Sequence, residues 1–152
     1  MRVKVREMGH SDRALWAQMR GWLWPEDPPD VHVQWVDEII HDPDYRGFVA
    51  ETEDGVPIGF AKIAIRKYAN GCLTHPVPFV EAIFVEPTHR RKRVATELLA
   101  FIEGLLIAQG FREIGSDARV ENAASHAAHR GWGFEETERV VYFRKSLGPG
   151  DT

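Results

Sequence analysis

A short apolar run that leads through a basic loop into a helical pattern is the feature that most constrains this chain. Residues 80–85 read as a buried strand, Pro87 ends it, and helical periodicity starts at Val94. This arrangement exposes the first backbone N–H groups of the helix and the positive end of its dipole. Cations are disfavoured there, so the run Arg90–Arg93 predicts a bound anion, and a pyrophosphate fits. The alternative is a helix start with solvated cations.

Length and composition predict one compact domain. The 152 residues, 43% of them hydrophobic, are enough for a core. We expect a single domain over residues 1–147 and a loose tail over 148–152. No apolar run is long enough to span a bilayer, and the charged, alternating start does not read as a signal peptide. The single cysteine, Cys72, suits a reducing compartment. We therefore expect a cytoplasmic protein with no membrane partner.

Charge is unevenly placed along the chain. The net charge of −4 argues against nucleic acid as the main partner. Cations gather at residues 90–93, whereas Glu26, Asp27 and Asp30 form an acidic patch. One molecule with both features can bind an anionic cofactor and a cationic substrate together. The alternative is that both runs are solvated faces.

The periodicity predicts an α+β fold with the element order βααβββαβαβ. Strands are expected at residues 2–7, 48–51, 57–66, 80–85, 113–116 and 138–145. Helices are expected from Ser11 or Asp12 to Leu23, from Asp30 to His41, from Val94 to Gln109 and from Asn122 to Arg130. The Asp54-Gly55 pair indicates a hairpin turn. The order implies a mixed sheet with helices on both faces, and ligands bind such sheets at the carboxyl ends of strands.

Glu81 is the carboxylate that the sequence singles out. It lies inside an otherwise apolar strand, where an unpaired charge is costly, and this favours a functional role. The alternatives are that Glu81 faces solvent or pairs with a neighbouring cation. By contrast, Asp117 follows a short strand, where Ser-Asp is common turn chemistry.

The element order and the basic loop resemble the GNAT family of acetyl-CoA-dependent N-acetyltransferases, and more narrowly the aminoglycoside 6′-N-acetyltransferases. The matching pieces run from the first helix to the last expected strand. They are Leu23-Trp-Pro, Tyr68-Ala-Asn-Gly-Cys, Pro76-Val-Pro-Phe-Val-Glu-Ala-Ile-Phe-Val, Ser116-Asp, Glu121-Asn and Gly133-Phe-Glu-Glu-Thr-Glu-Arg-Val.

The resemblance implies a GNAT fold and direct acetyl transfer from acetyl-CoA to the 6′-amine of an aminoglycoside in a ternary complex, giving antibiotic resistance. It implies that Glu81 and Asp117 are catalytic. The implied substrate-binding residues are Trp24, Asp27, Tyr68, Glu81, Asp117 and Glu138. The implied cofactor-binding residues are Ile83, Phe84, Val85, Arg90, Arg91, Lys92, Arg93, Val94, Ala95, Thr96 and Asn122. Relatives of this kind are often homodimers, and residues 140–143 are suited to an interface strand.

Arg93 departs from the family pattern. In the family, the pyrophosphate loop has a glycine at this position, and glycine permits left-handed backbone angles or a close approach to phosphate. If the native φ is positive, the arginine costs on the order of 1 kcal/mol or more. We expect cofactor binding to be retained. The rival hypothesis is a CoA-binding module that has lost activity, and a further alternative is acetylation of a polyamine, a small metabolite or a protein amine.

Other candidate constellations are weaker. His126 and His129 are three residues apart on a short helix, but no third ligand is apparent, so no metal site is expected. Tyr142 alternates with Val141 and Phe143, which favours a strand residue over a general acid. Cys72 has no evident histidine partner, and direct transfer needs no cysteine nucleophile. Asn122 can serve as a simple helix cap as well as a cofactor contact.

Overall fold

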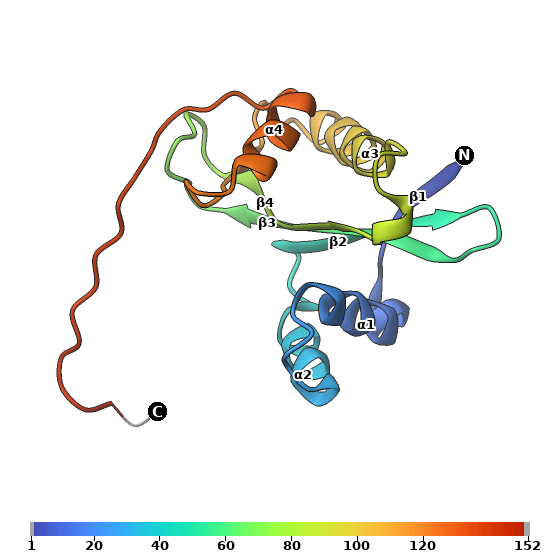
Figure 1. The fold of residues 1–152 in the computed structure, drawn as a ribbon, viewed down its shortest axis with the longest axis horizontal. Coiled ribbons are helices and arrows are strands. Elements are labelled where there is room, and N and C mark those ends of the chain that lie inside the picture. The colour runs from blue at the N-terminus through green and yellow to red at the C-terminus, as the bar shows by residue number, and fades with distance from the viewer. Residues whose placement is uncertain (1, 151–152) are drawn as a thin grey trace. The chain divides into compact units, whose positions relative to one another are not determined.

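A five-stranded sheet forms the centre of the unit made by residues 2–118 in the computed structural model, which describes residues 2–150. Its strands lie in chain order: β1 (Val3–Glu7), β2 (Tyr45–Thr52), β3 (Pro57–Arg66), β4 (Val77–Val85) and β5 (Gly115–Ser116). The first four pair in antiparallel fashion (Figure 1). The short strand β5 runs parallel to β4. The predicted mixed sheet is confirmed.

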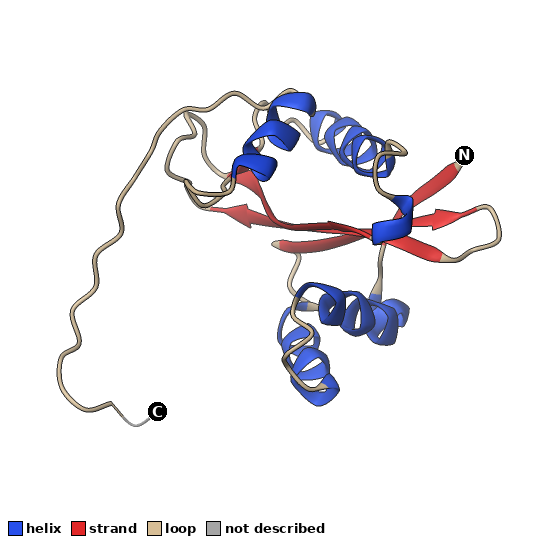
Figure 2. Ribbon diagram, viewed as in Figure 1, coloured by secondary structure: helices blue, strands red, loops and turns tan. Residues whose placement is uncertain are grey.

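Helices cover both faces of this sheet. The helices α1 (Arg13–Leu23) and α2 (Pro29–Ile39) lie on one face, and α3 (Val94–Ala108) lies on the other (Figures 1 and 2). Short 3-10 turns, η1 (His10–Asp12) and η2 (Pro87–His89), precede α1 and α3. Trp16 and Met19 of α1 and Val36 of α2 pack with Val49 and Phe60 of the sheet. The buried stripe of α3 is Val94, Leu98, Leu99, Ile102 and Leu106.

Several element boundaries differ from the sequence expectation: β2 and β4 each begin three residues earlier than expected, and two further differences have identifiable reasons. The second helix begins at Pro29 and not after Asp30, because proline is well suited to the first turn, where its missing N–H needs no partner. The strand expected at 113–116 contains only Gly115 and Ser116. Glu113 instead accepts hydrogen bonds from the backbone N–H groups of Leu73 (2.9 Å) and Thr74 (2.8 Å).

Residues 119–150 form a second unit with one helix, α4 (Ala123–Gly131). The strand expected at 138–145 is wrong: the structure gives these residues no strand, and Figure 2 draws them as loop. A strand requires a neighbouring backbone to complete its hydrogen bonds, and no described residue pairs with this segment. Its apolar side chains are exposed, 77% for Val141 and 92% for Phe143.

The expected single domain over residues 1–147 stays a prediction. Of the expected tail, residues 148–150 form no helix or strand, and residues 151–152 lie outside the described residues. Among residues 2–150, no helix is long and apolar enough to cross a membrane.

Gly47→Ala should destabilise the protein by about 1–3 kcal/mol, because a Cβ atom there would overpack the core. That atom would lie 2.7 Å from Met8 Cε and 2.9 Å from the Trp16 ring. Urea denaturation measures the change. Gly104→Ala on α3 is the matched control: its Cβ would meet nothing within 4 Å, so helix propensity alone predicts stabilisation by up to about 1 kcal/mol. Equal effects of the two changes would contradict the packing argument.

Candidate active site

A bulge in β4 places Glu81. The β3–β4 ladder pairs Lys62 with Ala82 and then Ile63 with Val80, so Glu81 is the extra residue between two rungs. A bulge bends the strand and re-aims the side chain of the inserted residue. This explains how a carboxylate can lie within an apolar strand without entering the core, and the Glu81 side chain is 24% exposed.

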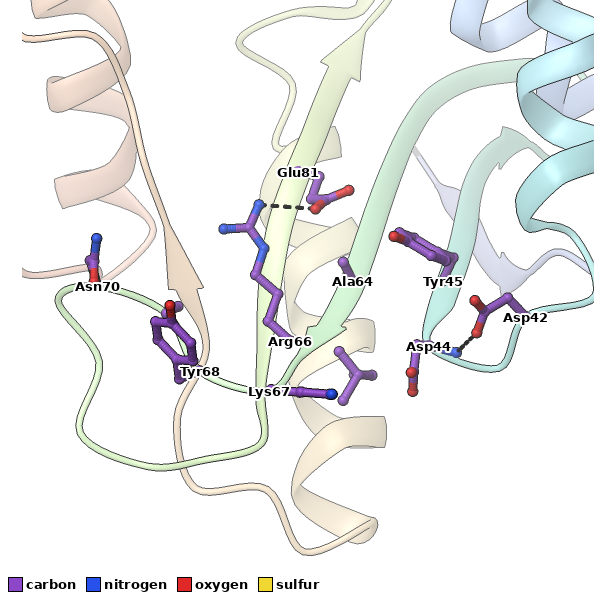
Figure 3. Close-up of a pocket in the computed structure, with 11 residues that line it drawn as sticks. Asp42, Asp44, Tyr45, Ala64, Arg66, Lys67, Tyr68, Asn70 and Glu81 are labelled. Atoms are coloured by element: carbon purple, nitrogen blue, oxygen red, sulfur yellow. Dashed lines mark hydrogen bonds and ion pairs between the residues drawn. The ribbon is translucent and has the colours of Figure 1, made fainter. Parts of the chain in front are cut away.

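Glu81 points into a pocket of about 520 Å³ (Figure 3). The pocket lies between the turn before β2, the end of β3 and the loop that follows β3. Its lining mixes both signs of charge and includes two aromatic rings. The lining residues other than Glu81 are Asp42, Asp44, Tyr45, Ala64, Ile65, Arg66, Lys67, Tyr68, Ala69 and Asn70.

Two cations of β3 hold the Glu81 carboxylate. Lys62 Nζ lies 3.1 Å from Oε1. Arg66 Nη2 donates to Oε2 at 2.9 Å, as Figure 3 shows. The alternative that Glu81 pairs with a neighbouring cation is therefore confirmed. Its catalytic role stays a prediction. Burial alone would raise the pKa of Glu81, but the bonds from Arg66 and Lys62 outweigh it and hold the pKa below its usual value. Glu81 is thus ionised at neutral pH.

The strand β4 has a partner on its β5 side for only a short stretch. β5 pairs with Phe79 and Val80 through Gly115 and Ser116 and then ends. The backbone of Ile83, Phe84 and Val85 therefore has no β5 partner within the described chain. Such an edge can accept an extended ligand as an added strand. Val80 of β4 pairs with Ser116 of β5, and Glu81 and Asp117 are the residues that directly follow this pair on the two strands. Asp117 is exposed.

The basic loop enters α3 through two left-handed residues. Arg91 has φ 62° and Arg93 has φ 65° with ψ 18°, so the position where the family has glycine does need a positive φ. All four cations, residues 90–93, are exposed. Arg90 is in addition held against β4, because its Nε donates to the Val85 carbonyl at 2.9 Å. The start of α3, with Val94, Ala95 and Thr96, therefore presents backbone N–H groups beside exposed cations, a suitable cradle for an anion.

The other predicted substrate residues of the first unit lie in two places. Tyr68 lines the pocket and is 74% exposed. Trp24 follows α1, and the guanidinium of Arg20 covers its ring at 4.7 Å while lying 4.9 Å from the ring of Trp35. Asp27 donates its backbone N–H to the Trp24 carbonyl at 3.2 Å. Trp24 and Asp27 thus belong to one anchored loop and do not line this pocket.

Two predicted site residues, Asn122 and Glu138, belong to the second unit, and so does Tyr142, whose expected place in a strand is wrong. Asn122 caps α4, with its side-chain oxygen accepting from the Ser125 N–H at 3.0 Å, so the capping role is confirmed and the cofactor role stays a prediction. Glu138 and Tyr142 lie in the exposed segment without regular structure.

The histidine pair considered as metal ligands also lies on α4. His126 Nε2 is 2.9 Å from the Arg119 carbonyl, and His129 Nδ1 is 2.7 Å from the Ser125 carbonyl. Within residues 2–150 there is no group of three or more His, Cys, Asp or Glu side chains placed to hold a metal ion.

Sequence reasoning missed the charged partners of Glu81. Lys62 interrupts the apolar run of β3 just as Glu81 interrupts that of β4. A single charge in each of two apolar strands, with opposite signs, indicates that the two strands are neighbours and that the charges form an ion pair. Asp42 and Asp44 were missed because nothing local distinguishes them from turn residues.

Comparisons with known proteins give a consistent result. Residues 15–134 match the model of the acetyltransferase (GNAT) family. The chain is 42% identical to an aminoglycoside N(6′)-acetyltransferase type 1 of Salmonella typhimurium, over 94% of this chain and 99% of that protein. It is 41% identical to a protein of the same name from Stenotrophomonas maltophilia, over 95% and 94%.

Solved structures agree with these relatives. AAC(6′)-Iy in complex with a bisubstrate analogue, CoA-S-monomethyl-acetylneamine, superposes with a TM-score of 0.87 at 39% identity, covering 97% of this chain and all of that one. The aminoglycoside 6′-N-acetyltransferase AAC(6′)-Ih from Acinetobacter baumannii gives a TM-score of 0.86 at 38% identity, with the same coverage.

Arg93→Gly should stabilise the protein by about 0.5–1 kcal/mol, since relief of the left-handed strain exceeds the entropy that glycine adds to the unfolded chain. Chemical denaturation gives the free energy of unfolding. Lys92→Gly is the matched control: Lys92 is a neighbouring exposed cation without a positive φ, so its replacement should destabilise the protein. If Arg93→Gly were as destabilising as Lys92→Gly, the strain at residue 93 would be refuted.

Proposed function

Because this chain belongs to the GNAT family of acetyltransferases, we propose that it is an aminoglycoside 6′-N-acetyltransferase that uses acetyl-CoA. The observation that carries the proposal is the match, over 97% of the chain, to an enzyme bound to an analogue that joins CoA to an acetylated aminoglycoside. The pocket with an ionised carboxylate beside an open strand edge supports the same chemistry.

Backbone groups of β4 and α3 are proposed to hold acetyl-CoA. The edge of Ile83–Val85 would pair with the pantetheine arm, and the backbone N–H groups of residues 91–96 would bind the pyrophosphate together with the cations Arg90–Arg93. Asn122 would contribute a further contact. When bound, acetyl-CoA supplies the acetyl group as a thioester, and an N–H of the β4 edge would stabilise charge on the thioester oxygen.

Glu81 and Asp117 are proposed to bind and deprotonate the amine. An aliphatic ammonium has a pKa near 10, so at neutral pH a base must remove its proton, directly or through water. A carboxylate can first bind the ammonium and then relay the proton. Trp24, Asp27, Tyr68 and Glu138 are proposed to bind the remaining rings and ammonium groups of the sugar.

Purified protein with acetyl-CoA should acetylate kanamycin and tobramycin, and Glu81→Gln and Asp117→Asn should each lower turnover at least about tenfold, because a positioned base is lost. Release of free CoA measures the rate, and mass spectrometry locates the acetyl group. The Gln and Asn side chains keep the shapes of Glu and Asp and remove their negative charge. Unchanged kinetics in both variants would reject these roles. Acetylation of spermidine or a lysine peptide alone would reassign the acceptor, and CoA binding without turnover would indicate a binding module.

We also propose that the protein acts in the cytoplasm and as a homodimer. The segment Val140–Phe143 supports the second proposal: it is apolar, β-prone and exposed, and it has no ladder partner among the described residues. An exposed strand-forming segment of this kind is a template for pairing with another chain, and a second copy supplies one.

The wild-type protein should therefore sediment at twice the mass of one chain, and the double variant Val141→Asp/Phe143→Asp should sediment as a monomer, because charges in a paired apolar strand are costly. Analytical ultracentrifugation measures the mass. Val56→Asp, in the β2–β3 turn and 53% exposed, is the control and should remain dimeric. A monomeric wild type, or a dimeric double variant, would refute this interface.

A further inference from the structure

Cations of the protein itself occupy both oxygens of the carboxylate that the proposed function assigns to the substrate amine. Lys62 holds Oε1 of Glu81, and Arg66 holds Oε2. A substrate ammonium group needs the same carboxylate. Each oxygen can accept a further bond, but an added ammonium would bring a third cation to one carboxylate, so it is favoured when one of the two internal cations moves away.

The two cations are held differently. The guanidinium of Arg66 lies 3.7 Å above the ring of Phe79 and makes a hydrogen bond of 2.9 Å to Glu81, so stacking and a directed bond both fix it. Lys62 carries a compact charge on a flexible stem. Its Nζ lies 5.0 Å from the centre of the Tyr45 ring, which offers the ammonium a second favourable contact. Lys62 is the less exposed of the two cations, with 22% of its side chain accessible against 38% for Arg66, so the difference between them lies in the type of bond. The ammonium of Lys62 can leave Glu81 and keep its contact with the Tyr45 ring, whereas Arg66 would lose a directed guanidinium bond.

We propose that Lys62 is an exchangeable counter-ion that the ammonium group of the substrate displaces from Glu81, and that Arg66 is a permanent counter-ion that keeps the carboxylate ionised and oriented. Both are positioning residues, because they act through Glu81. The inference rests on the proposed function. In the free protein, Lys62 stands in for the substrate cation and competes with it.

The remaining titratable groups around Glu81 come from the turn before β2, from β2, from the loop after β3 and from the residue after β5. They are Asp42, Asp44, Tyr45, Lys67, Tyr68 and Asp117. In the described part of the chain none of them bonds to the Glu81 carboxylate. The titration of Glu81 therefore depends first on the two β3 cations.

The test is the pH dependence of kanamycin acetylation at saturating acetyl-CoA in the wild type, Lys62→Met and Arg66→Met. The acidic limb of kcat/KM reports the free enzyme, and that of kcat reports the complex. Loss of a bonded cation raises the pKa of a carboxylate, so the ionised form is lost at a higher pH. Lys62→Met should move the limb of kcat/KM upward and leave that of kcat in place, because the substrate has already replaced Lys62 in the complex. Arg66→Met should move both limbs upward.

At neutral pH, Lys62→Met should also lower the KM for kanamycin by about two- to fivefold, the range expected when a partly exposed ion pair no longer competes. Lys4→Met is the matched control: it removes an exposed cation of β1 that lies outside the pocket and makes no bond to Glu81, so neither limb should move. The proposal is overturned if Lys62→Met moves both limbs or neither, or if it raises the KM.

A second readout separates this inference from the proposed function. Carbon-13 NMR of the Glu81 carboxyl in the substrate-free protein should show its titration at higher pH in both Lys62→Met and Arg66→Met. If no aminoglycoside is acetylated by the wild type, the proposed function fails and the NMR titration still decides the counter-ion roles. Unchanged titration in both variants overturns those roles even where acetylation occurs. Thermal unfolding checks that the variants fold. If Lys62→Met does not fold, Lys62→Gln replaces it in both measurements.

Discussion

The need of every backbone N–H and C=O group for a partner governs the organisation of this molecule around β4. On one side, β4 is paired with β3 from Val77 to Val85; on the other, β5 pairs with only two residues. The backbone of β4 is therefore paired on both sides at Phe79 and Val80, and on the β3 side alone at its end near the basic loop. The same asymmetry supports an extended ligand without any dedicated side chain, because the binding groups are main-chain atoms that every residue has.

The bulge in β4 connects this backbone arrangement to the charge of the pocket. An in-register strand would alternate its side chains, and Glu81 would then be directed by the alternation alone. The inserted residue instead lies between the Lys62 and Ile63 rungs and meets both β3 cations. The pocket consequently does not present a bare negative surface. It presents an ionised carboxylate that is already paired with two cations. A polycationic substrate therefore gains binding free energy mainly by exchanging ion-pair partners, and less by simple attraction.

The sequence predicted those parts of the structure in which local chemistry decides the conformation. The strand, loop and α3 were found because an apolar run, Pro87 and a change of period follow one another within a few turns of chain. The turn at Asp54-Gly55 was predicted because an Asp-Gly pair favours the positive φ of hairpin turns, and Gly55 has φ 83° in the structure. The strand predicted at 138–145 is absent because a strand also needs a neighbouring strand to pair with. The alternation of apolar and polar residues shows that a segment can pair, but it does not show whether a partner is present. The bonds from Lys62 and Arg66 to Glu81 were missed because they depend on a register shift between two strands, which leaves no trace in either strand alone.

The left-handed geometry of Arg91 and Arg93 has a consequence for recognition. The unfavourable angles are adopted when the chain folds, so the cost of shaping the loop is met before any anion arrives. If the proposed ligand binds this conformation, the loop would lose little entropy on association, and its exposed guanidinium groups would act mainly on the rate of encounter. On the proposed function, arginine in place of glycine would lower conformational stability and strengthen the long-range attraction of a negatively charged ligand.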